Sequence, residues 1–134
     1  MAIEPGLVME FSKTVEEGDT ARASAGDSLP PVLSTPKLIG LLEQAANTAL
    51  LSHLPEGQGS VGSLVNVRHL AATPVGMQVR IRAELLEVDG RRVRFKVEAW
   101  DAVDKIAEGE HERFIIDKVR FDDRLEKKRQ AIGH

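Results

Sequence analysis

Apolar residues change their spacing along the chain, from a helical period in the first half to a period of two in the second. The helical face consists of Leu38, Leu42, Ala45, Ala46 and Ala49. Pro36 suits the first helical turn, where a missing backbone N–H is harmless, and Pro55 and Gly57 end the segment. We therefore expect a helix over residues 36–53, with Thr35 as its N-terminal cap.

After this helix, alternating apolar and polar residues predict long strands joined by short turns. The strands are expected over residues 61–71, 77–85, 93–99 and 105–117. The turns are marked by residues 73–76, 89–90 and 101–104. On the first of these strands, the alternation places on one side Val61, Ser63, Val65, Val67 and His69.

The two ends of the chain carry weaker signals. Residues 7–15 alternate weakly and predict a first strand, whereas the Gly- and Pro-containing residues 16–34 predict a long lid or a poorly ordered loop. Residues 118–134 are charged and predict a terminal helix or tail. We expect one α+β domain over 1–134, a long antiparallel sheet wrapped around one central helix, whose open sheet edges favour dimerisation.

Composition narrows the classes of function. The 134 residues include no cysteine, which excludes disulfides, thiolate metal sites and a cysteine nucleophile. The formal net charge of -3 argues against a nucleic-acid partner. No apolar run approaches the roughly 18 residues of a membrane span, and the first residues do not resemble a signal peptide, so we expect a cytoplasmic protein with no membrane partner. No paired-histidine spacing suggests a metal.

Positive charge gathers in one stretch of this acidic chain. Residues 78–96 hold six basic and three acidic side chains. Such a surface is either a solvated strand face or a place for a small polyanionic ligand, such as the phosphates of CoA. The candidates for phosphate contacts are Arg80, Arg82, Arg92 and Arg94.

A glycine-rich run at residues 57–62 matches the pattern G-x-G-x-x-G. In dinucleotide-binding proteins this pattern follows a strand and opens a helix, whereas here it follows a helix and opens a strand. We therefore interpret it as a turn whose backbone approaches a ligand closely, or as a plain turn.

Three side chains suggest catalysis, and each has an ordinary alternative. Glu43 lies at the rim of the apolar helix face, where a raised pKa would suit a base or nucleophile, although exposed glutamates are common there. His69 shares the inward side of its strand with Val65 and Val67, where a satisfied core histidine is the alternative. Thr35 would offer its hydroxyl to a developing oxyanion at the positive helix end, or simply cap the helix.

The last strand contributes a further pair of candidates. His111 and Arg113 lie on the same side as Ala107, Gly109 and Ile115, which predicts that both polar side chains point inward. An inward arginine needs an anionic partner, either a carboxylate such as Glu43 or a ligand.

Three runs resemble a known family. They are STPKLIGLLEQAANTAL, GSVGSLVNVRHLAATPVGMQV and AELLEVDGRRVRFKVEAWDAVDKIAEGEHERF. They resemble the hotdog-fold acyl-CoA thioesterases, in particular the fluoroacetyl-CoA thioesterase-like branch, over about residues 5–120. The most specific parts are H-x-A-A-T-P-x-G at residues 69–76 and G-x-H-E-R at residues 109–113.

The resemblance implies specific roles for five residues. It implies a catalytic set of Thr35, Glu43 and His69, with Gly62 and Arg113 contacting the substrate or CoA. It also implies a homodimer or a dimer of dimers that binds acyl-CoA at a subunit interface, with no cofactor beyond this CoA thioester substrate.

The expected reaction is hydrolysis of a small or medium acyl-CoA thioester to a free acid and CoA. Glu43 would activate water or attack directly, His69 would move a proton, and Thr35 would hold the carbonyl or the water or act as nucleophile. A fluoroacetyl preference does not transfer, because residues 27–33 are aliphatic where a selective aromatic lid would be expected.

Two other functions are compatible with the same resemblance. The alternative is a non-catalytic acyl-CoA-binding or sensor module on the same fold. A hotdog hydratase ranks third, since such enzymes commonly carry an aspartate five residues before a histidine and this chain has none at that spacing.

Overall fold

The computed structural model describes residues 3–132, so the outermost residues of the expected 1–134 domain lie outside the described part. The strands are β1 (Val8–Thr14), β2 (Gln58–His69), β3 (Gln78–Asp89), β4 (Arg92–Trp100) and β5 (Lys105–Asp117). The helices are the short η1 (Glu17–Asp19) and α1 (Ala21–Ala25), the long α2 (Thr35–Leu51) and the terminal α3 (Lys118–Gln130).

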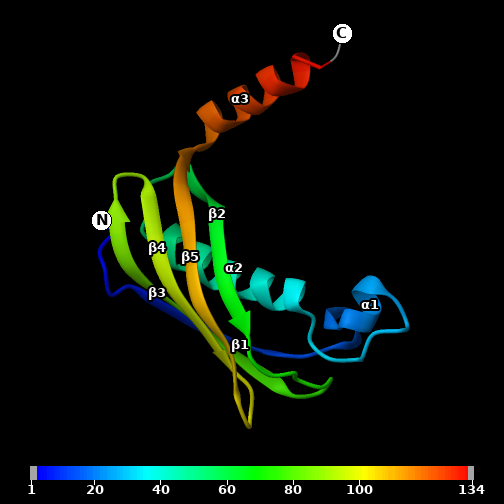
Figure 1. Cartoon of the computed structure of the whole chain (residues 1–134). Coiled ribbons are helices and arrows are strands. Elements are labelled where there is room, and N and C mark those ends of the chain that lie inside the picture. Colours follow the sequence, from blue (N-terminus) through cyan, green and yellow to red (C-terminus); the bar gives the residue numbers. More distant parts are fainter. Residues whose placement is uncertain (1–2, 133–134) are drawn as a thin grey trace.

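The five strands form one antiparallel sheet in the order β1-β3-β4-β5-β2. The sheet curves around α2, which lies against its concave face (Figure 1). This arrangement confirms the expected α+β sheet wrapped around a central helix. Strands β1 and β2 are the two edges, so each has one side without a partner strand in the described part of the chain.

The core lies between α2 and the middle strands. The predicted helical face is buried, and Leu41 and Leu50 extend it. Opposite it lie the inward residues of β3 and β4, which are Val79, Ile81, Ala83, Leu85, Val93, Phe95, Val97 and Ala99. The three alanines of the helix face permit a close approach between helix and sheet, which holds the side chains at the rim of this contact in fixed positions.

The start of α2 differs from the prediction by one residue. Ser34, not Thr35, is the N-cap, and its side chain accepts a hydrogen bond from the Lys37 N–H at 3.1 Å. Thr35 is instead the first helical residue. Both residue types cap helices well, so the sequence alone did not separate them. The consequence is that the Thr35 hydroxyl is available for contacts outside the helix.

The connection at residues 16–34 is structured rather than an open loop. It contains η1 and α1, and short bridges join Thr20 to Leu33 and Val32 to Pro74. Asp19 is buried and accepts ion pairs from Lys13 at 3.1 Å and Lys37 at 3.6 Å. These contacts attach the connection to the first turn of α2.

A bulge in β2 changes which residues face the helix. The pairing with β5 shifts between Gly62 and Leu64, so that one extra residue stands in β2. Before the bulge Ser60 and Gly62 face α2, whereas after it Val67 and His69 do. The prediction that Val61 and Ser63 share the side of His69 is therefore wrong, because one extra residue inverts the alternation.

The basic residues of β3 and β4 are neutralised by neighbouring carboxylates on the outer face of the sheet. Four pairs show this: Arg80 with Glu10, Arg82 with Glu84, Arg92 with Glu112, and Arg94 with Glu110. The solvated-face interpretation of residues 78–96 therefore fits the structure better than a phosphate site there.

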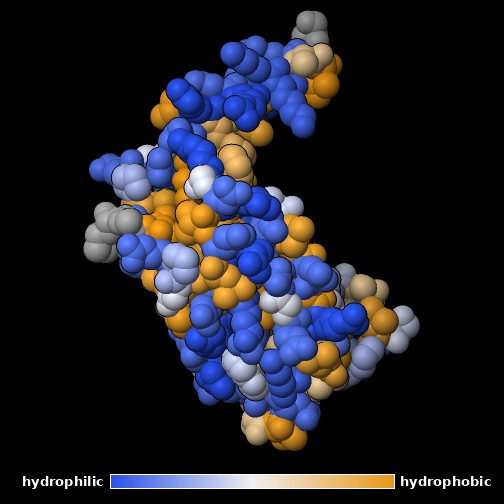
Figure 2. Space-filling view, turned by 60° about the vertical axis from the view of Figure 1, so that its left-hand side comes forward, coloured by the Kyte–Doolittle hydropathy of each residue, from blue (hydrophilic) through white to orange (hydrophobic). Residues whose placement is uncertain are grey.

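The terminal helix α3 stands away from the body of the molecule and buries none of its residues (Figures 1 and 2). Its surface is strongly hydrophilic (Figure 2). In the described part of the chain, no helix is long and apolar enough to cross a membrane.

Candidate functional site

The first of two polar clusters lies at the N-terminus of α2. The Thr35 hydroxyl and His69 Nδ1 are 2.7 Å apart, which joins the start of the helix to the end of β2. His69 Nε2 is buried, and among residues 3–132 it has no hydrogen-bond partner. An unsatisfied buried polar atom is rare in native proteins and marks a place where a ligand or substrate atom completes the contact.

Burial lowers the pKa of His69, and the backbone of Ala71 opposes this effect only in part. The imidazole is therefore neutral at pH 7. If the Thr35 hydroxyl donates to Nδ1, the proton of the neutral ring is on Nε2, which is the free nitrogen. The pair can then present an N–H donor to an oxygen atom placed beside it.

The second cluster lies one helix face further along α2. The Glu43 carboxylate is 3.7 Å from the Arg113 guanidinium, which is only 7% exposed. Gly62 makes room for this pair, since a Cβ there would lie 2.7 Å from Glu43 Oε2. The expectation that an inward Arg113 needs Glu43 or a ligand is confirmed for Glu43.

A hydrogen-bond network fixes Arg113 from two sides. Its Nε donates to Ser60 Oγ at 2.7 Å and its Nη2 donates to the Ser60 carbonyl at 3.0 Å. Ser60 Oγ in turn donates to Asn47 Oδ1 at 2.8 Å. Sequence analysis missed Ser60 and Asn47, because isolated small polar residues carry no periodic signal and the bulge conceals the inward direction of Ser60.

His111 completes the network at the bulge. Its Nδ1 donates to the Leu64 carbonyl at 2.8 Å, which leaves Nε2 to accept from Arg113 at 3.2 Å. The side chain is 1% exposed. Burial lowers the pKa of His111, and the Arg113 charge lowers it further, whereas the Leu64 carbonyl and Glu43 oppose the shift. A neutral His111 thus holds both the bulge and the arginine that holds Glu43.

The two clusters are separate within one protomer. Thr35 and Glu43 are eight positions apart on α2, or about 12 Å along the helix axis. Gly62 and His69 are seven positions apart on β2, or roughly 20 Å along the strand. The structure therefore joins Thr35 to His69, and Glu43 to Gly62 and Arg113, but it does not gather all five residues at one point.

We expect the buried histidine to make stability depend on pH. The native pKa of His111 lies below its usual value of 6.5. Between these two values the unfolded chain binds a proton that the native protein does not, so lowering the pH favours unfolding. The slope contributed by one such group is at most about 1.4 kcal/mol per pH unit.

Urea unfolding of the wild type and of His111→Gln, measured between about pH 5 and 7.5, checks this expectation. The free energy of unfolding of the wild type should fall more steeply below pH 6.5 than that of the variant. Equal slopes for the two proteins would show that His111 is protonated in the native state as readily as in the unfolded chain.

In the described residues, no group of three or more histidine, aspartate or glutamate side chains is arranged to hold a metal ion. The polar groups of the two clusters are instead those of acid–base and hydrogen-bonding chemistry: a carboxylate held by an arginine, and a hydroxyl bonded to an imidazole.

Comparison with known proteins places this arrangement in a family. Residues 15–119 match the family model FlK, described as fluoroacetyl-CoA-specific thioesterase. The fluoroacetyl-CoA thioesterase of Streptantibioticus cattleyicolor is 41% identical over 102 residues, which cover 76% of this chain and 73% of that protein.

Solved structures agree with this match. The fluoroacetyl-CoA thioesterase FlK superposes with a TM-score of 0.90 at 34% identity, covering 96% of this chain and 98% of that one. A Thermus thermophilus protein described as a thioesterase superfamily member superposes with a TM-score of 0.88 at 32% identity, covering 97% and 98%. The fold is the hotdog fold, and the chain belongs to the fluoroacetyl-CoA-specific thioesterase (FlK) family.

Proposed function

We propose that this protein is an acyl-CoA thioesterase that hydrolyses a small or medium acyl-CoA to a carboxylic acid and free CoA. The observation that carries the proposal is the Thr35–His69 hydrogen bond, which leaves a buried imidazole nitrogen free in a chain of the FlK family. The related FlK has been solved with fluoroacetate and CoA. We place the enzyme in the cytoplasm, since CoA thioesters are metabolites of the cell interior.

The proposal requires a homodimer, because the two clusters must meet. Strand β2 is an edge of the sheet, and Leu64 and Val65 on it are 42% and 43% exposed. Unpaired apolar edge strands favour pairing with a second strand. A two-fold axis between Val65 and Asn66 would make two β2 strands antiparallel neighbours. Positions equally far from that axis then lie opposite each other, and Gly62 and His69 are such positions.

This pairing would create two equivalent composite sites. Each would contain Glu43, Gly62 and Arg113 from one protomer, with His69 of the partner subunit and Thr35 of the partner subunit. A thioester carbonyl between them would have a carboxylate on one side and a hydrogen-bond donor on the other. The five residues separated within one protomer would thus act together.

The reaction follows from the chemistry of these groups. Glu43 takes a proton from a water molecule, and the hydroxide adds to the thioester carbon. The Nε2–H of His69 donates to the developing oxyanion, and Thr35 holds the ring in the required tautomer; one such donor typically contributes about 10²- to 10³-fold in rate. The intermediate collapses with cleavage of the C–S bond, and Glu43 returns its proton to the thiolate, releasing acid and CoA.

Release of free thiol from a panel of acyl-CoAs tests the function. The panel contains fluoroacetyl-, acetyl-, butyryl-, hexanoyl-, decanoyl- and phenylacetyl-CoA. Saturable turnover of at least one member is expected, and the equally purified Thr35→Val variant, which loses only the hydroxyl, should lose most of it. Binding of CoA esters by calorimetry without thiol release would instead support the sensor module.

A further inference from the structure

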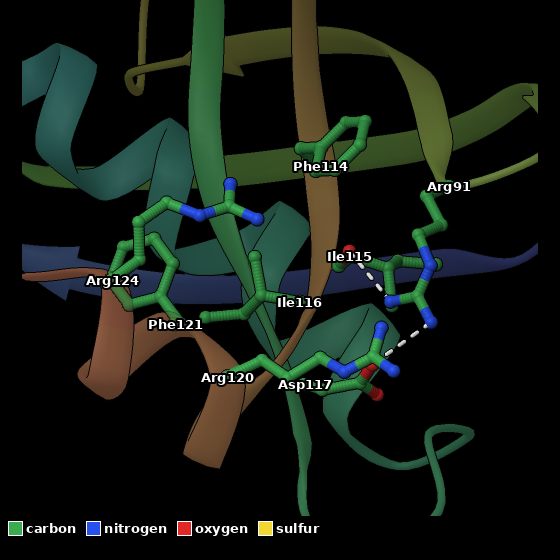
Figure 3. Close-up of a pocket in the computed structure, with 8 residues that line it drawn as sticks. All are labelled: Arg91, Phe114, Ile115, Ile116, Asp117, Arg120, Phe121 and Arg124. Atoms are coloured by element: carbon green, nitrogen blue, oxygen red, sulfur yellow. Dashed lines mark hydrogen bonds and ion pairs between the residues drawn. The ribbon is translucent and has the colours of Figure 1, made fainter.

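A pocket at the base of α3 lies outside both clusters. It has a volume of about 130 Å³ and lies where β5 passes into the helix. The residues that matter here are Arg91, Phe114, Asp117, Arg120, Phe121 and Arg124. Figure 3 shows that they come from the β3–β4 turn, from β5 and from α3, so three separate elements build the site.

The charge of this pocket is positive in a protein of net charge -3. Arg91 is bound to Asp117 at 3.1 Å and to the Ile115 carbonyl at 3.2 Å, which fixes its guanidinium in place. Within residues 3–132, Arg120 and Arg124 have no carboxylate partner in salt-bridge range. Three guanidinium groups therefore face one carboxylate, in contrast to the neutralised arginines of β3 and β4.

The pocket also offers aromatic surface. Phe114 is 44% exposed on the outer face of β5, and Phe121 stands on the first turn of α3 (Figure 3). Guanidinium groups bind phosphates with paired hydrogen bonds, and phenylalanine rings stack on nucleobases. The combination fits a small ligand that carries several phosphates and a base, rather than an acyl chain or a metal.

The position of the pocket relates it to the proposed reaction. Phe114 pairs with Val61 across the strands, and Arg113 and Gly62 are their immediate neighbours in sequence. The pocket is therefore at the Glu43 end of the sheet, not at the His69 end. A substrate bound at Glu43 would bring any long polar tail out near this end of the molecule.

We propose that this pocket binds the 3′-phosphorylated ADP part of the CoA substrate. This inference rests on the proposed function and adds the place where the nucleotide is held. Arg120 and Arg124 contact the phosphates, Arg91 closes the pocket from the turn, and the adenine stacks on Phe114 or Phe121. The helix α3, which buries none of its own residues, thereby acquires a role as one wall of a substrate site.

The test compares acyl-CoA with the corresponding acyl-pantetheine, which lacks the nucleotide, using the double variant Arg120→Gln/Arg124→Gln. For acyl-CoA, KM should rise about tenfold or more with kcat nearly unchanged, because charge-assisted hydrogen bonds are lost. For acyl-pantetheine, KM should be the same in wild type and variant. Adenosine 3′,5′-bisphosphate should inhibit the wild type competitively and the variant much more weakly.

A matched control removes the same charge elsewhere on α3. Lys128→Gln/Arg129→Gln lies in the last turn of the helix, outside the pocket. An equal rise in KM for this control would mean long-range attraction rather than a site, and would overturn the proposal. An unchanged KM in the pocket variant, or a changed oligomeric state that accounts for the effect, would overturn it as well.

Failure of the proposed function gives a different result. If neither thioester is hydrolysed by the wild type, the proposed thioesterase activity is wrong, and calorimetric titration with CoA and with pantetheine then decides about the pocket. CoA binding that exceeds pantetheine binding and is weakened in Arg120→Gln/Arg124→Gln would still support the nucleotide site. Equal binding of both, or none, would refute it.

Discussion

Replacing Glu43 by glutamine is expected to reduce kcat for acyl-CoA hydrolysis by about 10²- to 10⁴-fold, the usual contribution of a general base. Glutamine has nearly the same shape, so the fold and the space beside Gly62 are preserved. It cannot take a proton from water, and it removes the negative charge that lies 3.7 Å from the buried Arg113 guanidinium. Thiol release under substrate saturation measures the effect.

The control for this variant is Glu87→Gln. Glu87 also pairs with an arginine, Arg94 at 3.4 Å, but on the outer face of the sheet. Its replacement should leave kcat within about twofold of wild type, since exposed ion pairs contribute little. A Glu43→Gln enzyme that retains more than a tenth of wild-type kcat would exclude the carboxylate as the base.

The same variant also shows whether the site spans two subunits. Glu43→Gln and His69→Ala proteins, unfolded together and refolded as a mixture, form mixed dimers in which one of the two composite sites is intact. Random pairing should then restore about a quarter of wild-type activity from two nearly inactive proteins. If each site lay within one protomer, no mixed dimer would contain an intact site and activity would stay absent.

The second large effect is expected from Gly109→Ala, and it concerns stability. A Cβ at Gly109 would lie 2.1 Å from the Asn66 carbonyl oxygen and 2.7 Å from the Val67 Cα. Both contacts are with the backbone of the neighbouring strand, so no side chain can move aside. We expect the variant to lose about 3 kcal/mol of its free energy of unfolding, measured by urea denaturation.

Gly40→Ala is the matched comparison. Gly40 lies in the interior of α2, and a Cβ there would meet no atom within 4 Å. This change should stabilise the protein by about 0.5–1 kcal/mol, because alanine loses less backbone entropy in a helix. A Gly109→Ala protein that is as stable as Gly40→Ala would mean that β2 and β5 separate at low cost.

Periodicity predicted the fold because burial repeats along each element. Leu38, Leu42 and Ala49 follow the turn of α2, and the strands alternate between a solvated and a buried face. The pairing of Arg113 with Glu43 was also predictable, since a buried charge needs an opposite charge. Ser34 was missed as the cap because its neighbour Thr35 caps equally well.

Other parts of the site depend on contacts that leave no mark in the sequence. The bulge between Gly62 and Leu64 occurs inside an uninterrupted run of strand residues, so alternation continued through it placed Gly62 outward. Separation of the five candidates into two clusters follows from the lengths of α2 and β2, and it became visible only when both were positioned in space.

The bulge in β2 sets a rule of parity for the chain. In a regular strand, two residues share a face only when an even number of positions separates them, and Gly62 and His69 are separated by seven. Both reach the helix because β2 contains one additional residue. Deleting Ser63 would therefore turn one of them outward, so the length of this strand is under as strict a constraint as the identity of either residue.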